Sequence, residues 1–91
     1  AGLNKATKNL AKSLGKQGIR VNAILPGSID TDMTREKYSD PAVYQALVDR
    51  LPLSKRGTGD DIAQQAVFLA SPEAGYITGQ LISVDGGWLL Q

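Results

Sequence analysis

One stretch of the sequence decides the fold: IRVNAILPGSIDTDM, residues 19–33. It begins with an apolar, β-branched run, 19–25, which has the length expected of a buried strand. The run stops at Pro26-Gly27, a pair that cannot continue a central strand and that favours a sharp turn. In open α/β sheets, ligands bind beyond the carboxyl ends of the parallel strands. The sequence therefore predicts a buried strand followed by a ligand-binding loop.

The composition excludes several classes of protein. With 91 residues and a net charge of +1, the chain makes one small domain at most. Cysteine and histidine are both absent, which excludes disulfides, thiolate metal sites, the usual zinc sites and a Ser-His-Asp triad. No apolar run has the length of a membrane span or of a secretory signal. We therefore expect a protein of a reducing, cytoplasmic compartment with no membrane partner.

Residues 3–16 are predicted to form an amphipathic helix that covers a sheet. Apolar and small side chains recur at helical spacing on one face, and Gly15 and Gly18 are expected to end the helix in left-handed conformations. Lysines lie on the opposite face, without the interleaved aromatic residues that stack on bases. We therefore expect a solvated face and no nucleic-acid partner. The predicted apolar face consists of Leu3, Ala6, Thr7, Leu10 and Leu14.

Acidic side chains follow the turn at Asp30, Asp32 and Glu36. Their spacing suggests a divalent-cation site, but the glycine-centred loop of an EF-hand is missing. We expect solvated carboxylates and no metal site.

Residues 34–51 are predicted to form a helical excursion. Ser39 or Asp40 would cap a helix that begins at Pro41 and is ended by Pro52. The excursion is either a lid that excludes water from a site or a plain connection, and the sequence leaves both open. The predicted apolar face consists of Val43 or Tyr44, Leu47, Val48 and Leu51.

The last third of the sequence predicts a helix and a second strand. Thr58 and Asp61 resemble a capping box at the start of a helix that runs to about residue 71, and residues 81–84 form a short apolar strand. Strand, excursion, helix and strand make a parallel βαβ unit. Because two parallel strands with free edges cannot complete a sheet, we expect part of a larger α/β domain. Predicted buried positions of the helix are Ile62, Ala66, Val67, Leu69 and Ala70.

Four segments carry a resemblance to a known family: GIRVNAI at 18–24, PGSIDTDM at 26–33, DIA at 61–63 with FLAS at 68–71, and YITGQ at 76–80 with VDGG at 84–87. Together they resemble the C-terminal portion of a short-chain dehydrogenase/reductase, an NAD(P)-dependent oxidoreductase. The implied fold class is α/β, a partial, doubly wound parallel sheet of Rossmann type. Residues 1–91 would be the C-terminal part of a single NAD(P)-binding domain.

The resemblance implies a site for the nicotinamide end of NAD or NADP. Pro26 and Gly27 would line the nicotinamide ring, where a missing side chain lets the backbone approach the ligand closely. The backbone of Ile29 would hold the carboxamide. The Thr31 hydroxyl would bond to the carboxamide or the pyrophosphate, and Met33 would pack nearby. The implied activity is hydride transfer between the cofactor and a ketone or secondary alcohol.

The family's catalytic tyrosine and lysine, four residues apart, do not occur together in this sequence, and its Gly-rich phosphate loop is also missing. Ala1-Gly2 resembles the small residues that commonly follow the catalytic lysine, so we expect the catalytic part to lie upstream. We assign no catalytic residue and expect no activity from residues 1–91 alone. The three tyrosines, Tyr38, Tyr44 and Tyr76, are followed four residues later by Ala42, Val48 and Gln80.

A second hypothesis is a non-catalytic, truncated α/β module that self-associates through exposed strand edges and has no affinity for a cofactor. In the dehydrogenase interpretation, the resemblance also implies a homo-oligomer, a dimer or a tetramer. Strand 81–84 and the tail 88–90 are candidate contacts. Trp88 is the strongest single candidate for a contact between subunits, although packing of its side chain on its own subunit is equally compatible with the sequence. The excursion suggests only a partly apolar small-molecule substrate.

Overall fold

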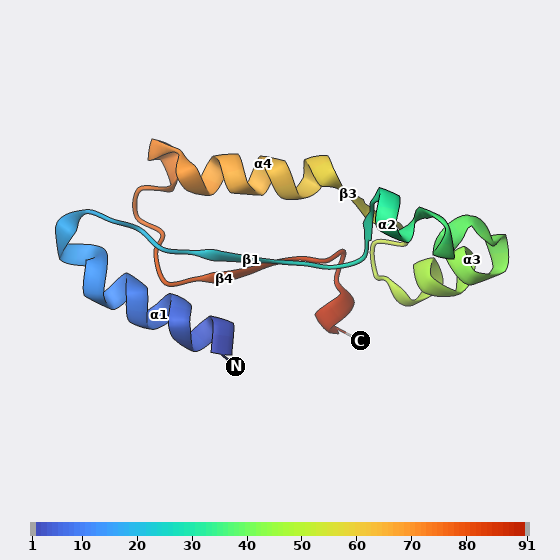
Figure 1. Ribbon diagram of the computed structural model, residues 1–91, viewed down its shortest axis with the longest axis horizontal. Coiled ribbons are helices and arrows are strands. Elements are labelled where there is room, and N and C mark those ends of the chain that lie inside the picture. The colour runs from blue at the N-terminus through green and yellow to red at the C-terminus, as the bar shows by residue number, and fades with distance from the viewer. Residues whose placement is uncertain (1, 91) are drawn as a thin grey trace. The chain divides into compact units, whose positions relative to one another are not determined.

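The computed structural model describes residues 2–90 and divides them into two compact units (Figure 1). Unit 1 contains residues 2–25 and 64–83, and unit 2 contains residues 26–63 and 84–90. Each unit is therefore built from two segments that lie far apart in the sequence. Ala1, which the sequence analysis compared with the residue after the family's catalytic lysine, lies outside the described residues.

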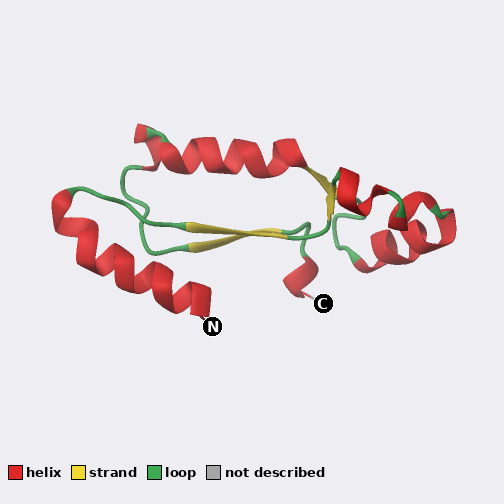
Figure 2. Cartoon of the chain, viewed as in Figure 1, coloured by secondary structure: helices red, strands yellow, loops and turns green. Residues whose placement is uncertain are grey.

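The strands of unit 1 form a parallel pair. Strand β1 is Ala23–Pro26 and strand β4 is Leu81–Val84, with the last residue of each in unit 2. The Ala23 amide donates to the Gln80 carbonyl and the Gly27 amide donates to the Val84 carbonyl, so both strands run in the same direction (Figure 2). Helix α1, Gly2–Leu14, and the 64–70 part of helix α4, Gly59–Ala70, lie on opposite sides of the pair in Figure 1. This is the arrangement of a doubly wound α/β sheet and confirms the predicted fold class.

Strand β1 begins later than the predicted strand 19–25, because the residues before it are bonded to a turn. The side-chain Nδ2 of Asn22 donates to the Ile77 carbonyl at 3.0 Å, and the backbone amide of Gln80 donates to the side-chain Oδ1 of Asn22 at 3.1 Å. These bonds hold the polar side chain of Asn22 against the turn at residues 77–80, outside the strand ladder. The prediction for strand 81–84 is confirmed without change.

Helix α1 ends in a short 3-10 turn, Gly15–Gln17. Gly18 follows with a φ of +78°, as predicted, and its amide bonds to the Gly15 carbonyl. The expectation of a left-handed Gly15 is wrong, because Gly15 starts the 3-10 turn instead. One glycine is enough to reverse the chain at this point.

The apolar faces of the unit 1 helices are only partly covered. Thr7 of α1 and Leu69 of α4 are buried, as predicted. Leu3 and Leu10 are more than half exposed, however, and Val67 is 69 % exposed against the prediction that it is buried. Periodicity identifies an apolar face correctly, but burial also requires another element to pack on that face. Ala66 and Ala70 of the predicted buried set are exposed for the same reason.

Unit 2 contains the helical excursion, which the structure confirms and divides into three pieces. Asp40 caps the longest helix, because its carboxylate accepts from the Ala42 amide at 2.9 Å, whereas Ser39 bonds to the Glu36 carbonyl. Val48 and Leu51 are the buried residues of its apolar face. The pieces are α2 at Asp32–Arg35, a 3-10 turn at Lys37–Ser39 and α3 at Pro41–Arg50.

A second, very short parallel pair closes the excursion. Strand β2, Ile29–Asp30, pairs with strand β3, Gly57–Thr58, in a register that places Ile29 opposite Gly57. The sequence analysis missed this pair, because strands of two residues have no periodicity to detect.

The C-terminal segment packs against α3 and the loop after it within unit 2. The guanidinium of Arg50 lies 4.8 Å from the centre of the Trp88 ring, in a 3-10 turn at Trp88–Leu90. Trp88 is half-buried, so packing on its own chain is realised, while Leu89 and Leu90 are exposed. None of the helices within residues 2–90 is both long and apolar enough to cross a lipid bilayer.

Candidate functional site

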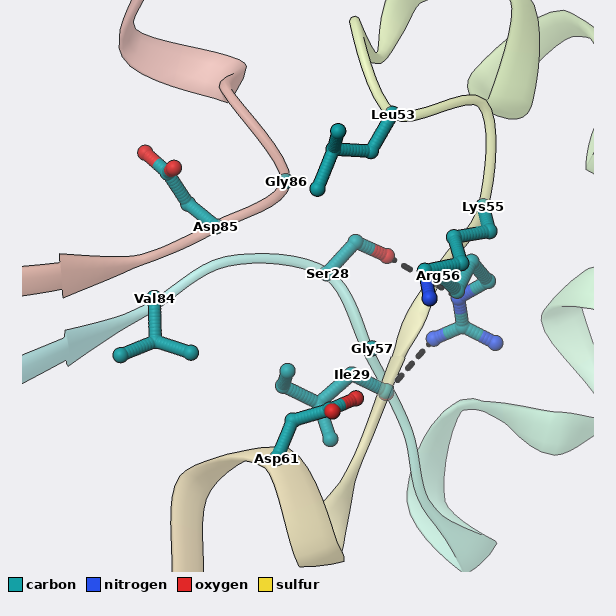
Figure 3. Close-up of a pocket in the computed structure, with 10 residues that line it drawn as sticks. All are labelled: Ser28, Ile29, Leu53, Lys55, Arg56, Gly57, Asp61, Val84, Asp85 and Gly86. Atoms are coloured by element: carbon teal, nitrogen blue, oxygen red, sulfur yellow. Dashed lines mark hydrogen bonds between the residues drawn. The ribbon is translucent and has the colours of Figure 1, made fainter. Parts of the chain in front are cut away.

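The predicted binding loop, residues 26–33, leaves the carboxyl end of β1 and passes the end of β4 (Figure 3). The Gly27 amide donates to the Val84 carbonyl at 3.0 Å. A Cβ atom at Gly27 would lie 2.6 Å from the Cα of Asp85, closer than side chains approach a backbone. Glycine is therefore required at this position by Asp85 of the same unit, a reason independent of any ligand.

The five residues predicted to bind the cofactor lie on this loop with different exposures. Pro26 and Thr31 are exposed and Met33 is 94 % exposed, whereas Gly27 and Ile29 are half-buried. The loop therefore presents an apolar thioether and a hydroxyl to solvent and keeps its middle against the rest of unit 2.

A cavity of about 190 Å³ lies beside the middle of the loop in unit 2. Ile29 is the only one of the five predicted residues that lines it. The other lining residues come from the loop, from the segment before α4, from the first turn of α4 and from the end of β4 (Figure 3): Ser28, Leu53, Lys55, Arg56, Gly57, Asp61, Val84, Asp85 and Gly86.

The Arg56 side chain, only 5 % exposed, connects three residues of the loop region. Its Nε donates to the Ser28 hydroxyl at 3.0 Å, and its Nη2 donates to the Ile29 carbonyl at 2.7 Å and to the Thr34 hydroxyl at 2.9 Å. Figure 3 shows the bonds to Ser28 and Ile29. Hydrogen bonds from a charged donor are about twice as strong as neutral ones, so Arg56 is a strong restraint on this stretch of the chain.

The remaining faces of the guanidinium are also occupied. The ring of Tyr38 lies with its centre 4.2 Å from the Arg56 guanidinium carbon, a cation–π distance. The Asp30 carboxylate lies 3.8 Å from Nη1 and balances the charge. A buried cation is tolerated where it is paired and hydrogen-bonded in this way.

Asp61, at the start of α4, lines the cavity as a carboxylate. The Thr58 amide donates to it at 2.7 Å, and the Thr58 hydroxyl lies 3.2 Å away. The backbone bond from Thr58 lowers the pKa of Asp61 most, and the bond from the Thr58 hydroxyl lowers it further. Desolvation acts in the opposite direction, and the charge of Lys55 makes the least contribution to the lowering of the pKa. The predicted resemblance to a capping box is confirmed, because the Asp61 amide also lies 3.4 Å from the Thr58 hydroxyl.

Two of the three acidic residues after the turn, Asp30 and Asp32, are ordinary partners of arginine. Asp32 bonds to Arg35 at 2.8 Å, and Asp30 lies 3.8 Å from both Arg35 and Arg56. Within residues 2–90, no group of three acidic, cysteine or histidine side chains is placed to hold a metal ion.

Sequence reasoning missed Ser28, Thr34 and Arg56 as residues of the site. Arg56 lies next to Lys55 in a polar loop, and nothing in a single sequence separates a buried arginine from a solvated lysine beside it. The signal is available only once the β2–β3 register is known, because that register puts residue 56 next to residue 28.

Comparison with known proteins gives a consistent result. A family model described as enoyl-(acyl carrier protein) reductase matches residues 1–89. The chain is 46 % identical over 87 residues to L-rhamnose 1-dehydrogenase (NAD(P)(+)) of Azotobacter vinelandii, covering 96 % of this chain and 34 % of that protein.

Solved structures are similar over nearly the whole chain. A short-chain type dehydrogenase/reductase from Mycobacterium ulcerans superposes with a TM-score of 0.91 at 34 % identity, covering 99 % of this chain and 33 % of that one. A 4-hydroxyisoleucine dehydrogenase complexed with NADH superposes with a TM-score of 0.90 at 37 % identity, covering 99 % of this chain and 37 % of that one. The chain thus spans about a third of the length of these relatives.

Proposed function

This chain belongs to the short-chain dehydrogenase/reductase family, and from that premise we propose that loop 26–33 binds the nicotinamide end of NAD or NADP. One observation carries the proposal: the loop leaves the carboxyl end of β1 beside the end of β4, where ligands bind in open α/β sheets. The nicotinamide dinucleotides named for two of the relatives support it.

The surface that the loop exposes fits a ligand of mixed polarity. Pro26 and the backbone of Gly27 line the ring, and the backbone of Ile29 holds the carboxamide. The exposed Thr31 hydroxyl bonds to the carboxamide or the pyrophosphate, and the exposed Met33 side chain packs nearby. These contacts orient one face of the ring toward the substrate.

The proposed activity is that of an oxidoreductase acting on a ketone or secondary alcohol. When bound, the nicotinamide group donates or accepts the hydride. The loop contributes geometry, because hydride transfer requires the reacting carbons to be held at near-attack distance. The groups that transfer the proton belong, in this proposal, to a longer polypeptide of which residues 1–91 are one part.

We also propose a cytoplasmic homo-oligomer, a dimer or a tetramer, with a small and partly apolar substrate. The exposed apolar side chains of Leu89 and Leu90 and those of Leu3 and Leu10 support self-association.

The test uses the natural-length protein from its source, whose intact mass is measured first. NADH and NADPH are titrated by nicotinamide fluorescence, and their oxidation is followed with a panel of ketones. Thr31→Ala is expected to weaken nucleotide binding by roughly fivefold to tenfold, the effect of one hydrogen bond. Ser13→Ala, which removes an exposed hydroxyl from α1, is the matched control and is expected to bind normally.

Failure to bind either nucleotide would refute the proposal. Self-association of such a protein would then favour the second hypothesis, a non-catalytic module that pairs through strand edges. Nucleotide binding that Thr31→Ala leaves unchanged would refute the assignment of the loop.

A further inference from the structure

We propose that Arg56 is a positioning residue, which sets the conformation of loop 26–33 and through it the affinity for the nicotinamide cofactor. The inference depends on the proposed function of the loop. It goes beyond that function by assigning the control of the loop to a side chain that lies outside it.

The backbone of the loop has little regular structure of its own. Beyond the bond from the Gly27 amide to the Val84 carbonyl at its start, its ladder is the two-residue pair β2–β3, with the Gly57 amide bonded to the Ser28 carbonyl at 3.0 Å. Arg56 directly precedes this pair, so one short segment restrains the loop through both its backbone and its side chain. The consequence is that the loop and this segment are linked at more than one point.

Arg56 bonds to the carbonyl of Ile29, the residue whose backbone is proposed to hold the carboxamide. Nη2 donates to the Ile29 carbonyl at 2.7 Å and also to the Thr34 hydroxyl, which itself lies 3.1 Å from the same carbonyl. A carbonyl oxygen held from two directions fixes the rotation of its peptide plane. That plane belongs to the residue whose backbone is proposed to hold the carboxamide.

Thr34 extends the restraint to the far end of the loop. The Thr31 amide donates to the Thr34 hydroxyl at 3.2 Å, and the Thr34 amide donates to the Thr31 carbonyl at 3.1 Å. Because a hydroxyl carries one proton, Thr34 can donate to only one of its neighbouring oxygens at a time. With Arg56 and the Thr31 amide both donating to it, that proton is directed to an acceptor such as the Ile29 carbonyl.

A lysine could not replace this arginine. The planar guanidinium presents donors along one edge to Ser28 and Ile29 while its face stacks on Tyr38. An ammonium group keeps the charge and loses both the fork and the stacking surface.

Four variants of the natural-length protein test the proposal: Arg56→Met, Arg56→Lys, Thr34→Val, and Arg50→Met as the matched control. Arg50 also stacks on an aromatic ring, that of Trp88, but in a different part of unit 2. Three quantities are measured: hydrogen exchange of the amides at residues 28–35, the Kd for NADH and NADPH, and the midpoint of denaturant unfolding.

Arg56→Met is expected to raise the Kd about tenfold or more and Thr34→Val about threefold to tenfold, on the scale of one lost hydrogen bond. Arg56→Lys is expected to give an intermediate Kd. Exchange should accelerate at residues 28–35 in all three and stay unchanged in Arg50→Met. A purely structural arginine would instead lower the unfolding midpoint and leave the Kd of the folded protein unchanged.

The outcomes separate this inference from the function on which it depends. Normal exchange and normal Kd in Arg56→Lys and Thr34→Val, in a protein that binds nucleotide, refute the inference alone. Faster loop exchange with an unchanged Kd refutes the cofactor role of the loop and the inference with it. If Arg56→Met does not fold, Arg56→Lys and Thr34→Val decide the question, because each retains most of the buried contacts.

Discussion

Each of the two units contains an arginine that donates to at least one backbone carbonyl of a segment distant in sequence, and the two arginines have different effects. In unit 1, Arg20 donates to the Leu69 carbonyl at 2.6 Å and to the Ser71 carbonyl at 3.2 Å. These carbonyls lie at the end of α4, where helices leave their last acceptors unpaired. In unit 2, Arg56 donates to a loop.

The difference lies in what else holds the acceptor. The carbonyls bonded by Arg20 belong to the last turn of α4 and to Ser71 directly after it, and the earlier turns of the helix form without them, so Arg20 completes an element that already exists. The carbonyl bonded by Arg56 belongs to a loop with a two-residue ladder, so Arg56 determines which conformation that loop adopts. Identical chemistry therefore stabilises a helix end in one unit and organises a candidate site in the other.

The largest difference between the two units is expected when one glycine in each is replaced by alanine and the loss of unfolding free energy is compared. Gly27→Ala in unit 2 places a Cβ atom 2.6 Å from the Asp85 backbone and should lower the free energy of unfolding by about 3 kcal/mol. Gly18→Ala in unit 1 meets no atom within 4 Å and should cost only about 1 kcal/mol, for its positive φ. Denaturant unfolding of both variants measures the two costs. Equal costs would show that Asp85 moves aside and that the loop is less constrained than its contacts indicate.

A smaller effect is expected from removing the helix-end arginine. Arg20→Met should lower the free energy of unfolding by about 1 kcal/mol, because the last carbonyls of α4 can turn to water instead. Hydrogen exchange should accelerate at residues 67–71 and remain unchanged at residues 28–35. Faster exchange in the loop would contradict the division of roles between the two arginines.

The smallest effect concerns the charge of Asp61. Because its pKa in the folded protein is below the ordinary value of 3.8, ionised Asp61 contributes stability above that pH and loses the contribution as the pH falls through the lower, folded pKa. Wild-type stability should thus decrease more steeply than that of Asp61→Asn below about pH 4.

Thr58→Ala sharpens this prediction. It retains the backbone amide, 2.7 Å from the carboxylate, which is the main cause of the shift. Carbon-13 NMR titration of the Asp61 carboxyl should therefore show a pKa that stays below 3.8 in the variant. A midpoint at or above that value would contradict the account of the N-terminal turn of α4.

Much of the fold follows from local patterns in the sequence. Strand 81–84, a helix cap at Ser39 or Asp40 and the left-handed Gly18 each have a signal within a few residues. The structure confirms the strand and Gly18 and selects Asp40 as the cap. The α/β class followed from the order of elements, and its doubly wound, Rossmann-type form followed from the family resemblance. Burial was less predictable, as Val67 shows, because it depends on what packs against a helix and not on the helix alone.

The candidate site was predictable only in position. The turn at Pro26-Gly27 located the loop, but the contact with Asp85 and the bonds of Arg56 connect residues far apart in the sequence. Both residues of each contact are present in the sequence, but nothing in a single sequence indicates that they lie next to each other in the folded chain. For this reason Gly27 was explained by the close approach of a ligand, although the neighbouring backbone of Asp85 already requires a glycine there.

The short pair β2–β3 also has a consequence for how this region tolerates insertions and deletions. It joins the two ends of the excursion, so residues 31–56 form a closed loop whose entry and exit are fixed by the register of Ile29 and Gly57. Lengthening a closed loop costs little, roughly 0.6 kcal/mol for each doubling. Segments of different length and sequence could therefore be exchanged between residues 39 and 51 while Tyr38, the β2–β3 pair and the candidate cofactor loop stay in place.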